Sequence, residues 1–129
     1  YIFKKPKIAI TGLNLHCENF FKLSEENRII KPAIKVLKNK KIDIKGPFPA
    51  DTIFLKQNTK KFDVIVGMYH DQVLAPIKAL YNFNAINITL GLPFLRVSPD
   101  HGPNYNMIGK NKSDPQSLID AIKFLDKIK

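Results

Sequence analysis

The stretch Phe62-Asp63-Val64-Ile65-Val66-Gly67-Met68 carries the strongest strand signal in the chain, because its β-branched residues run unbroken up to a glycine. His70 follows almost at once, and residues 72–80 then place apolar side chains at helical spacing. A buried strand that passes through a short polar loop into a helix is typical of α/β proteins. The stretch therefore indicates an α/β fold, with a polar loop at the carboxyl end of the strand.

Toward the amino terminus, Ile8-Ala9-Ile10-Thr11 predicts another buried strand, which ends at Gly12. Ser24 offers an N-cap, the acidic residues after it suit the positive end of a helix dipole, and residues 29–37 keep helical spacing. Pro32 interrupts this pattern. The helix therefore either kinks there or begins its regular part just before, with the proline in its first turn.

The stretch Gly46-Pro47-Phe48-Pro49 predicts an extended turn, because a proline cannot donate a hydrogen bond to a strand ladder. Residues 51–56 predict a short helix or turn, and residues 85–90 a further strand. A terminal helix follows, with Asp114 as N-cap, Pro115 at its first position and an apolar face that extends to Leu125. Strands and helices thus alternate along the chain.

We therefore predict a single α/β unit over residues 1–129, with its strands in a mixed or parallel sheet. The apolar runs are only a few residues long, far short of the roughly 20 that span a membrane, so we expect no membrane segment. The single cysteine and the lack of a signal-peptide pattern favour the cytoplasm. The start without Met suggests a cut through a longer chain.

The formal net charge is +10, and 19 of the 21 cationic residues are lysines. They are scattered, without interleaved aromatic residues, and only Arg28 and Arg96 could form the bidentate contacts common in nucleic-acid recognition. The charge therefore favours a solvated surface over a nucleic-acid interface.

All three histidines, His16, His70 and His101, lie in loops that we expect at strand ends. Ligand sites in open α/β sheets collect at the carboxyl ends of strands, and neutral imidazoles are common ligands of divalent metals. Asp71 or Asp51 could fix the tautomer of a ligand histidine. The alternative is that these are ordinary surface histidines, since no local motif such as HExxH is present.

Three further polar residues, Lys78, Asn87 and Arg96, fall near predicted element ends, and together they would suit a phosphate or carboxylate. Taken singly, each is better explained as a surface residue. Cys17 beside His16 suggests a nucleophile pair, but sequence neighbours in a loop rarely have the geometry for proton transfer. A buried, inert cysteine is the favoured interpretation.

Five motifs follow one another along the chain: Gly12-Leu13-Asn14-x-His16, Gly46-Pro47-x-Pro49-Ala50-Asp51-Thr52, Met68-Tyr69-His70-Asp71-Gln72, Asn87-x-Thr89-Leu90-Gly91-Leu92-Pro93-x-x-Arg96-x-Ser98-Pro99-Asp100-His101-Gly102 and Gly109-Lys110. In this order, the motifs resemble the 4-hydroxythreonine-4-phosphate dehydrogenase family of vitamin B6 biosynthesis. The resemblance implies the carboxyl-terminal portion of a longer enzyme, with the three-layer α/β/α fold of the isocitrate and isopropylmalate dehydrogenases.

The resemblance implies a divalent metal (Zn, Mg or Co) held by three histidines shared between the subunits of a homodimer. Two of them match His16 and His70, and the third belongs to a portion outside this chain. Asp51 and Asp71 match carboxylates near the metal, which we expect to be catalytic.

For the substrate, a small phosphorylated amino acid, the resemblance implies contacts from Lys78, Asn87 and Arg96. For NAD or NADP it implies the segments around Gly91 and His101-Gly102. The expected reaction is oxidation of 4-phosphohydroxy-L-threonine with decarboxylation, on the route to pyridoxal 5'-phosphate.

The chain departs from the family pattern at Leu15, where a proline is usual, and over residues 17–21, where a Gly-rich stretch is usual. Residues 103–106 also differ from the expected small residues. Two alternatives therefore stay open. One is a related dehydrogenase of 4-phosphorylated threonate or erythronate, and the other is an inactive fragment or binding module.

Overall fold

The computed structural model describes residues 5–17, 22–103 and 105–128. The departures from the family pattern at positions 18–21 and 104 lie outside these described residues. The contacts group into two compact parts, unit 1 (residues 1–76) and unit 2 (residues 77–129), and each is described by itself. No described helix is long and apolar enough to cross a lipid bilayer.

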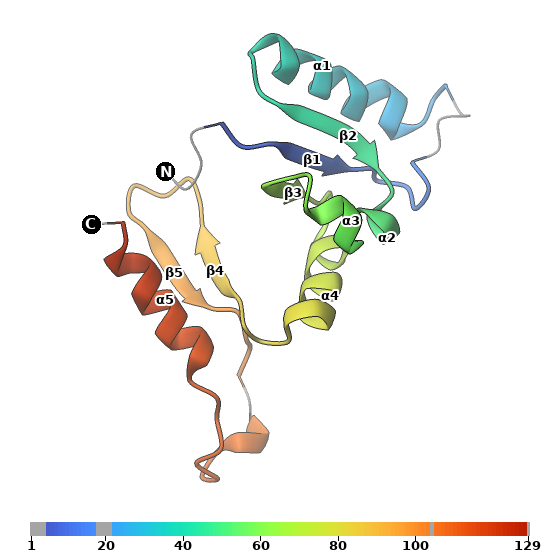
Figure 1. Cartoon of the computed structure of the whole chain (residues 1–129). Helices are drawn as coiled ribbons and strands as arrows, with labels where there is room; N and C mark the ends of the chain where they lie inside the picture. Colours follow the sequence, from blue (N-terminus) through green and yellow to red (C-terminus); the bar gives the residue numbers. More distant parts are fainter. Residues whose placement is uncertain (1–4, 18–21, 104, 129) are drawn as a thin grey trace. The chain divides into compact units, whose positions relative to one another are not determined.

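Unit 1 is built on a parallel sheet with strand order β2-β1-β3, which confirms the α/β class with a parallel sheet (Figure 1). Short helices follow β2, and α4 begins in this unit. The elements are β1 (Ile8–Thr11), a π-helical turn (Glu26–Ile30), α1 (Lys31–Asn39), β2 (Ile44–Phe48), α2 (Ala50–Ile53), α3 (Lys56–Thr59), β3 (Val64–Val66) and α4 (His70–Tyr81).

Helix α1 packs on one face of this sheet. The core there joins Ile10 of β1 and Ile44 of β2 to Ile30 and Ile34 from the helical segment. Ser24 accepts a hydrogen bond from the backbone N–H of Asn27 at 3.4 Å, as expected of a residue at the helix start. The regular helix begins at Lys31 with the proline in its first turn, so the second of the two predicted arrangements is confirmed.

The prediction of an extended turn over Gly46-Pro47-Phe48-Pro49 is wrong for its first three residues, which belong to β2. The register passes from Ala9↔Lys45 to Thr11↔Phe48, so Gly46 and Pro47 together oppose one residue of β1. This is a β-bulge, and β2 lies at the edge of the sheet, two settings in which a strand tolerates proline. Gly46 has a φ of +139°, which favours glycine.

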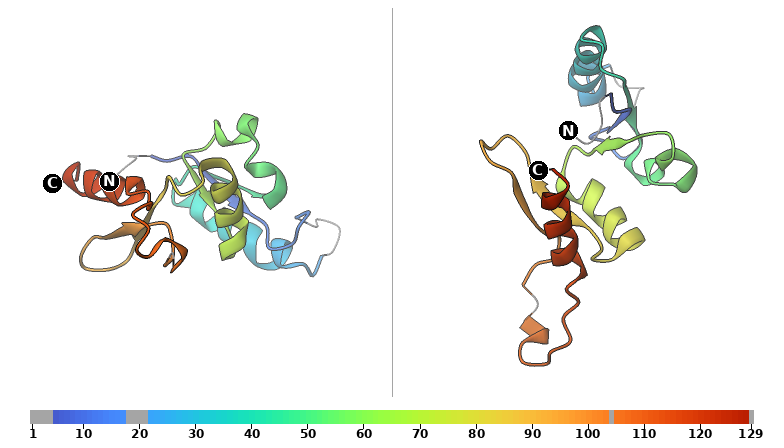
Figure 2. Two further views of the ribbon diagram at one scale, coloured as in Figure 1. Left: turned by 90° about the horizontal axis from the view of Figure 1, so that it is seen from below. Right: turned by 60° about the vertical axis from the view of Figure 1, so that its left-hand side comes forward.

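Unit 2 contains an antiparallel pair of strands, β4 and β5, with α5 alongside them in both views of Figure 2. The strand β5 was not predicted, because its sequence Arg-Val-Ser-Pro shows little β pattern. The helix α5 begins at Gln116 with Pro115 just before it, so the predicted start at Pro115 is one residue early, and Asp114 accepts a hydrogen bond from Gln116 N at 2.9 Å. The elements are β4 (Ile86–Thr89), β5 (Arg96–Pro99), a 3-10 turn (Tyr105–Met107) and α5 (Gln116–Asp126).

Candidate functional site

One edge of the parallel sheet in unit 1 gathers three candidate residues. Because β1, β2 and β3 are parallel, the segments that follow them leave from the same edge. His16 lies in the turn after β1, Asp51 in the first turn of α2 after β2, and His70 after β3. All three are exposed. The prediction that His70 lies in a loop is wrong, since His70 is the first residue of the helix α4.

The loop that carries His16 is fixed by hydrogen bonds to the side chain of Glu26. This carboxylate is fully buried and accepts hydrogen bonds from Leu13 N at 2.9 Å, Asn14 N at 2.8 Å and Asn14 Nδ2 at 2.7 Å. Burial alone would raise the pKa of Glu26, but the bonds from Asn14 and Leu13 outweigh it and hold the pKa below its ordinary value. The sequence assigned this residue only to the helix dipole, so its role under the loop was missed.

Gly12, at the start of the same loop, leaves room for two neighbours. A Cβ at this position would lie 2.6 Å from Cys17 Sγ and 3.1 Å from Glu26 Oε1. Cys17 itself is buried, and burial raises the pKa of its thiol, with the charges of Glu26 and Asp51 acting in the same direction. A thiol of raised pKa is a poor nucleophile, which agrees with the inert cysteine favoured from the sequence.

The imidazole ring of His70 contacts a carboxylate, as the rings of metal-binding histidines commonly do. Its Nδ1 lies 2.8 Å from Asp71 Oδ1, and both side chains are largely exposed, at 76% and 81%. When Nδ1 donates to the carboxylate, the lone pair of Nε2 is left for a metal. The donor chemistry at His16 and His70 therefore fits two ligands of a divalent transition metal. Among the described residues, no group of three or more His, Cys, Asp or Glu side chains could hold a metal ion.

Gln72, in the first turn of α4, links the two histidine-bearing segments. It is only 6% exposed, and its Nε2 donates to Gly12 O at 2.8 Å. Its Oε1 accepts from Thr11 Oγ1 at 2.7 Å and from Met68 N at 2.7 Å. The sequence offered no signal for this role beyond the position of Gln72 in the motif that contains His70.

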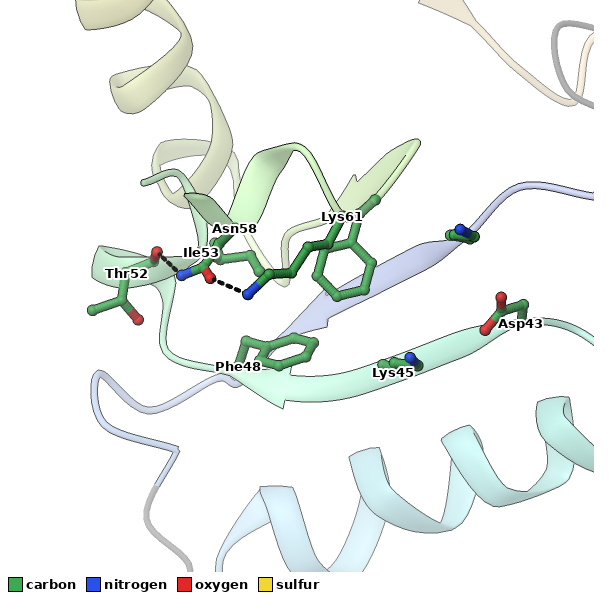
Figure 3. Close-up of a pocket in the computed structure, with 9 residues that line it drawn as sticks. Asp43, Lys45, Phe48, Thr52, Ile53, Asn58 and Lys61 are labelled. Atoms are coloured by element: carbon green, nitrogen blue, oxygen red, sulfur yellow. Dashed lines mark hydrogen bonds between the residues drawn. The ribbon is translucent and has the colours of Figure 1, made fainter. Parts of the chain in front are cut away.

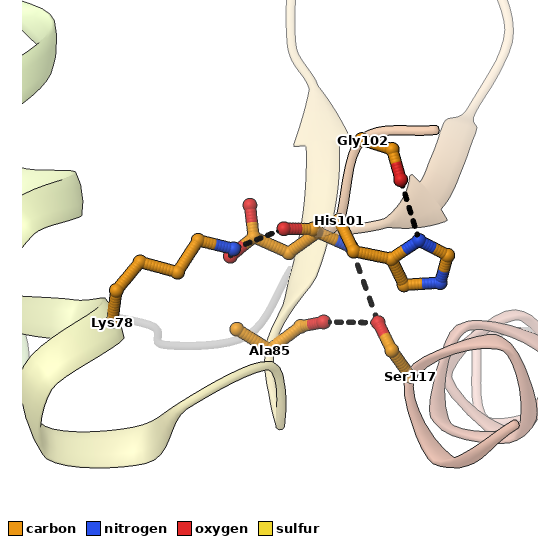
Figure 4. Close-up of polar contacts among 6 residues, drawn as sticks. Lys78, Ala85, His101, Gly102 and Ser117 are labelled. Carbon is orange, nitrogen blue, oxygen red and sulfur yellow. Dashed lines mark hydrogen bonds and ion pairs between the residues drawn. The ribbon is translucent and has the colours of Figure 1, made fainter. Parts of the chain in front are cut away.

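In unit 2, Lys78 forms an ion pair with Asp100. Figure 4 shows Lys78 among the polar contacts that also include Ser117 and Ala85. Its Nζ lies 2.8 Å from Asp100 Oδ2, also donates to the Asp100 carbonyl, and sits 4.9 Å from the ring centroid of Phe83. Asp100 is held in turn by Ser117, whose hydroxyl accepts from Asp100 N at 3.1 Å and donates to Ala85 O at 2.6 Å. The cation predicted to bind substrate is thus anchored by a residue that sequence reasoning did not select.

Asn87 and Arg96 lie on the same face of the β4–β5 pair. Arg96 is opposite Thr89 in the register, and Asn87 is two residues before Thr89, so their side chains project to one side. Arg96 Nη1 donates to Thr89 Oγ1 at 2.8 Å. Both Asn87 and Arg96 are exposed, as a binding role requires.

The residues predicted for the cofactor fall in two places in unit 2. His101 and Gly102 line a cavity of about 420 Å³, together with Phe83, Lys112 and Asp114 among others. Gly91 lies in a bend with a φ of +85°, and a Cβ there would meet no atom within 4 Å. The structure therefore places two of the three beside a cavity and the third in an open bend.

A second cavity, of about 510 Å³, lies within unit 1 (Figure 3). Lys7, Lys45 and Lys61 line it, together with the tilted ring pair of Phe48 and Phe62, whose centroids are 5.4 Å apart. None of the residues selected from the sequence lines it.

The chain belongs to the family described as pyridoxal phosphate biosynthetic protein PdxA, which it matches over residues 1–125. It is 46% identical over 125 residues to the 4-hydroxythreonine-4-phosphate dehydrogenase of Bradyrhizobium diazoefficiens, covering 96% of this chain and 36% of that protein. It is 51% identical over 120 residues to the same-named protein of a Sulfurihydrogenibium species, covering 92% of this chain and 37% of that protein. The chain thus spans little more than a third of these relatives.

Solved structures agree with this assignment. A structure of a putative 4-hydroxythreonine-4-phosphate dehydrogenase from Salmonella typhimurium matches with a TM-score of 0.76 and 41% identity, covering 95% of this chain and 38% of that one. A 4-hydroxythreonine-4-phosphate dehydrogenase from Klebsiella pneumoniae matches with a TM-score of 0.77 and 36% identity, covering 95% and 37%. The fold and the family therefore agree, over the same partial length.

Proposed function

We propose that the natural polypeptide containing this chain oxidises and decarboxylates 4-phosphohydroxy-L-threonine, with NAD or NADP as oxidant, in pyridoxal 5'-phosphate biosynthesis. The observation that carries the proposal is the common sheet edge of His16 and His70 in a chain that matches the PdxA family over residues 1–125. Two imidazoles after adjacent parallel strands suit a metal-assisted dehydrogenase better than an inert surface.

His16 and His70 would hold a divalent metal such as Zn, Mg or Co, with a third ligand from outside this chain in a site shared by a homodimer. When bound, the metal supplies Lewis acidity, which lowers the pKa of a substrate hydroxyl and stabilises negative charge on oxygen. Asp71 orients the ring of His70 through their 2.8 Å contact. Asp51, at the same sheet edge, is proposed as a second carboxylate near the reacting atoms.

Lys78, Asn87 and Arg96 would bind the substrate. The guanidinium of Arg96 has one described contact, to Thr89, so its other N–H groups can donate to a phosphate or carboxylate. Asn87 lies on the same strand face and can donate and accept hydrogen bonds. Such remote contacts orient the carbon that loses its hydride.

The cofactor would lie against His101 and Gly102, whose cavity includes the cation of Lys112 and the aromatic ring of Phe83. A cation and an aromatic face suit the phosphate and the ring of a dinucleotide. Gly91, in its open bend, lets a ligand approach the backbone closely. When bound there, the nicotinamide would supply the acceptor for the hydride of the substrate.

We also propose that the 129 residues alone do not turn over substrate, and that the natural protein works in the cytoplasm. The chain covers 36% and 37% of two relatives, and its described residues include no group of three or more His, Cys, Asp or Glu side chains that could hold a metal ion. A site that lacks a metal ligand and part of its binding surface loses most of its transition-state stabilisation.

The test uses the natural polypeptide at its full length, with His16→Ala, His70→Ala and, as a matched surface control, Glu25→Gln. Reduction of NAD by 4-phosphohydroxy-L-threonine should fall at least 100-fold in both histidine variants, together with Zn²⁺ affinity. The control should match the wild type in both measurements. Unchanged turnover in either histidine variant would contradict the proposed metal site, and turnover of 4-phospho-threonate or erythronate alone would contradict the proposed substrate.

A further inference from the structure

We infer that Gln72 is a positioning residue that sets the spacing between the segments carrying His16 and His70. The inference rests on the proposed function, because it concerns the metal that these two histidines would bind. It adds a residue that touches neither metal nor substrate but acts through the backbone on both sides of the site.

The side-chain amide of Gln72 spans the ends of two neighbouring strands. On the β1 side it donates to Gly12 O at 2.8 Å and accepts from Thr11 Oγ1 at 2.7 Å. On the β3 side it accepts from Met68 N at 2.7 Å. Both lone pairs of Oε1 and one N–H of Nε2 are therefore used, on a side chain that is 6% exposed. A buried and satisfied amide of this kind is rigid.

The two histidines lie close along the chain to the atoms that this amide holds. Met68 is two residues before His70, and Gln72 is two residues after it. On the other side, Gly12 begins the loop that carries His16, and Glu26 fixes the backbone of the next two residues. The loop is thus anchored at its start to Gln72 and in its middle to Glu26.

Only an amide of this length satisfies all three partners. Glutamate keeps both acceptor contacts but cannot donate to Gly12 O, and it places a negative charge beside that carbonyl. Methionine fills a similar volume but makes none of the hydrogen bonds. Gly67 leaves room for the next residue of α4, because a Cβ at position 67 would lie 2.4 Å from Val73 Cγ2.

Loss of this link should allow the two histidine segments to shift relative to each other. Metal geometry tolerates little displacement, and removing groups that orient ligands typically costs about 10–100-fold in metal affinity. We expect Gln72→Glu and Gln72→Met to weaken Co²⁺ binding by at least about tenfold. We also expect them to change the visible absorption spectrum of the Co²⁺-loaded protein, which reports ligand geometry.

The experiment uses the natural full-length polypeptide, titrated calorimetrically with Co²⁺ alone, in the wild type and both Gln72 variants. The matched controls are Gln57→Glu and Gln57→Met, at an exposed glutamine of α3 in the same unit. The urea midpoint of each metal-free protein is measured in parallel, so that affinity is compared only among folded samples.

Weakened binding with an altered spectrum in a folded Gln72 variant, and neither change in the Gln57 variants, supports the inference. Wild-type affinity and spectrum in a folded Gln72 variant overturn it and leave the proposed function standing. Failure of both Gln72 variants to fold without metal also overturns it, in favour of a role in folding alone. If the wild type itself does not bind Co²⁺, the proposed metal site fails, and this inference falls with it.

Discussion

Replacing Glu26 by glutamine should destabilise the protein strongly, although the two side chains have nearly the same shape. The carboxylate is fully buried and accepts three hydrogen bonds, two from backbone N–H groups and one from the amide of Asn14. Hydrogen bonds to a charged acceptor contribute roughly 1.5–3 kcal/mol each, against roughly 0.5–1.5 for neutral ones. Neutralising the acceptor therefore costs about 1 kcal/mol per bond, or about 3 kcal/mol in all.

The contribution of Glu26 to the free energy of unfolding depends on pH. The pKa of Glu26 lies below its ordinary value of 4.5, so the folded state binds the proton less readily than the unfolded chain does. Its stabilising contribution is thus complete above about pH 4.5 and is lost as the pH falls through the folded-state pKa. The difference in stability between wild type and Glu26→Gln should be largest near neutral pH and should shrink in acid.

Urea unfolding at several pH values, on the natural polypeptide, measures both effects. Glu25→Gln is the matched control, because Glu25 is the exposed neighbour, and it should change the free energy of unfolding by less than about 0.5 kcal/mol. A loss below about 1 kcal/mol in Glu26→Gln at pH 7, or a difference from wild type that does not vary with pH, would refute the reasoning.

Three further predictions concern Gly67, Ser117 and Cys17. Gly67→Ala would place a Cβ 2.4 Å from a methyl carbon of α4, and the resulting shift should cost about 1–3 kcal/mol in thermal or urea unfolding; an unchanged midpoint would contradict it. Ser117→Ala removes the hydroxyl that joins Asp100 N to Ala85 O and should lower the free energy of unfolding by about 1–3 kcal/mol. Ser117→Thr keeps a hydroxyl for these hydrogen bonds, so it serves as the matched control. Burial raises the pKa of the Cys17 thiol, so iodoacetamide at pH 7 should modify it far more slowly in the folded than in the urea-unfolded protein, and equal rates would show an accessible thiol.

Strands and helices with a regular apolar pattern were predictable from sequence. The first strand coincides with Ile8–Thr11, and α4 and α5 lie close to their predicted spans. The run around Pro47 was misread because the rule that proline breaks a ladder holds for central, regular strands. At an edge strand with a bulge the missing N–H leaves no partner unsatisfied, and that setting depends on strand order, which local sequence does not contain.

In the candidate site, too, only part of the arrangement could be predicted from the sequence. It could be predicted that His16 and His70 each follow a strand, whereas the adjacency of the two strands comes from the structure. The roles of the buried groups Glu26 and Gln72 could not be predicted, because Glu26 binds residues 12 and 13 positions away and Gln72 also binds residues 60 and 61 positions away along the chain. A glutamate at a helix start is ordinarily exposed, and only the fold reveals that this one lies beneath a loop.

The most direct test of the central proposal is NAD reduction by the natural full-length polypeptide, supplied with 4-phosphohydroxy-L-threonine and a divalent metal, before and after chelation. We predict turnover that stops when the metal is removed and returns when it is restored. Turnover that persists without metal, or no turnover of this substrate under any metal, would contradict it.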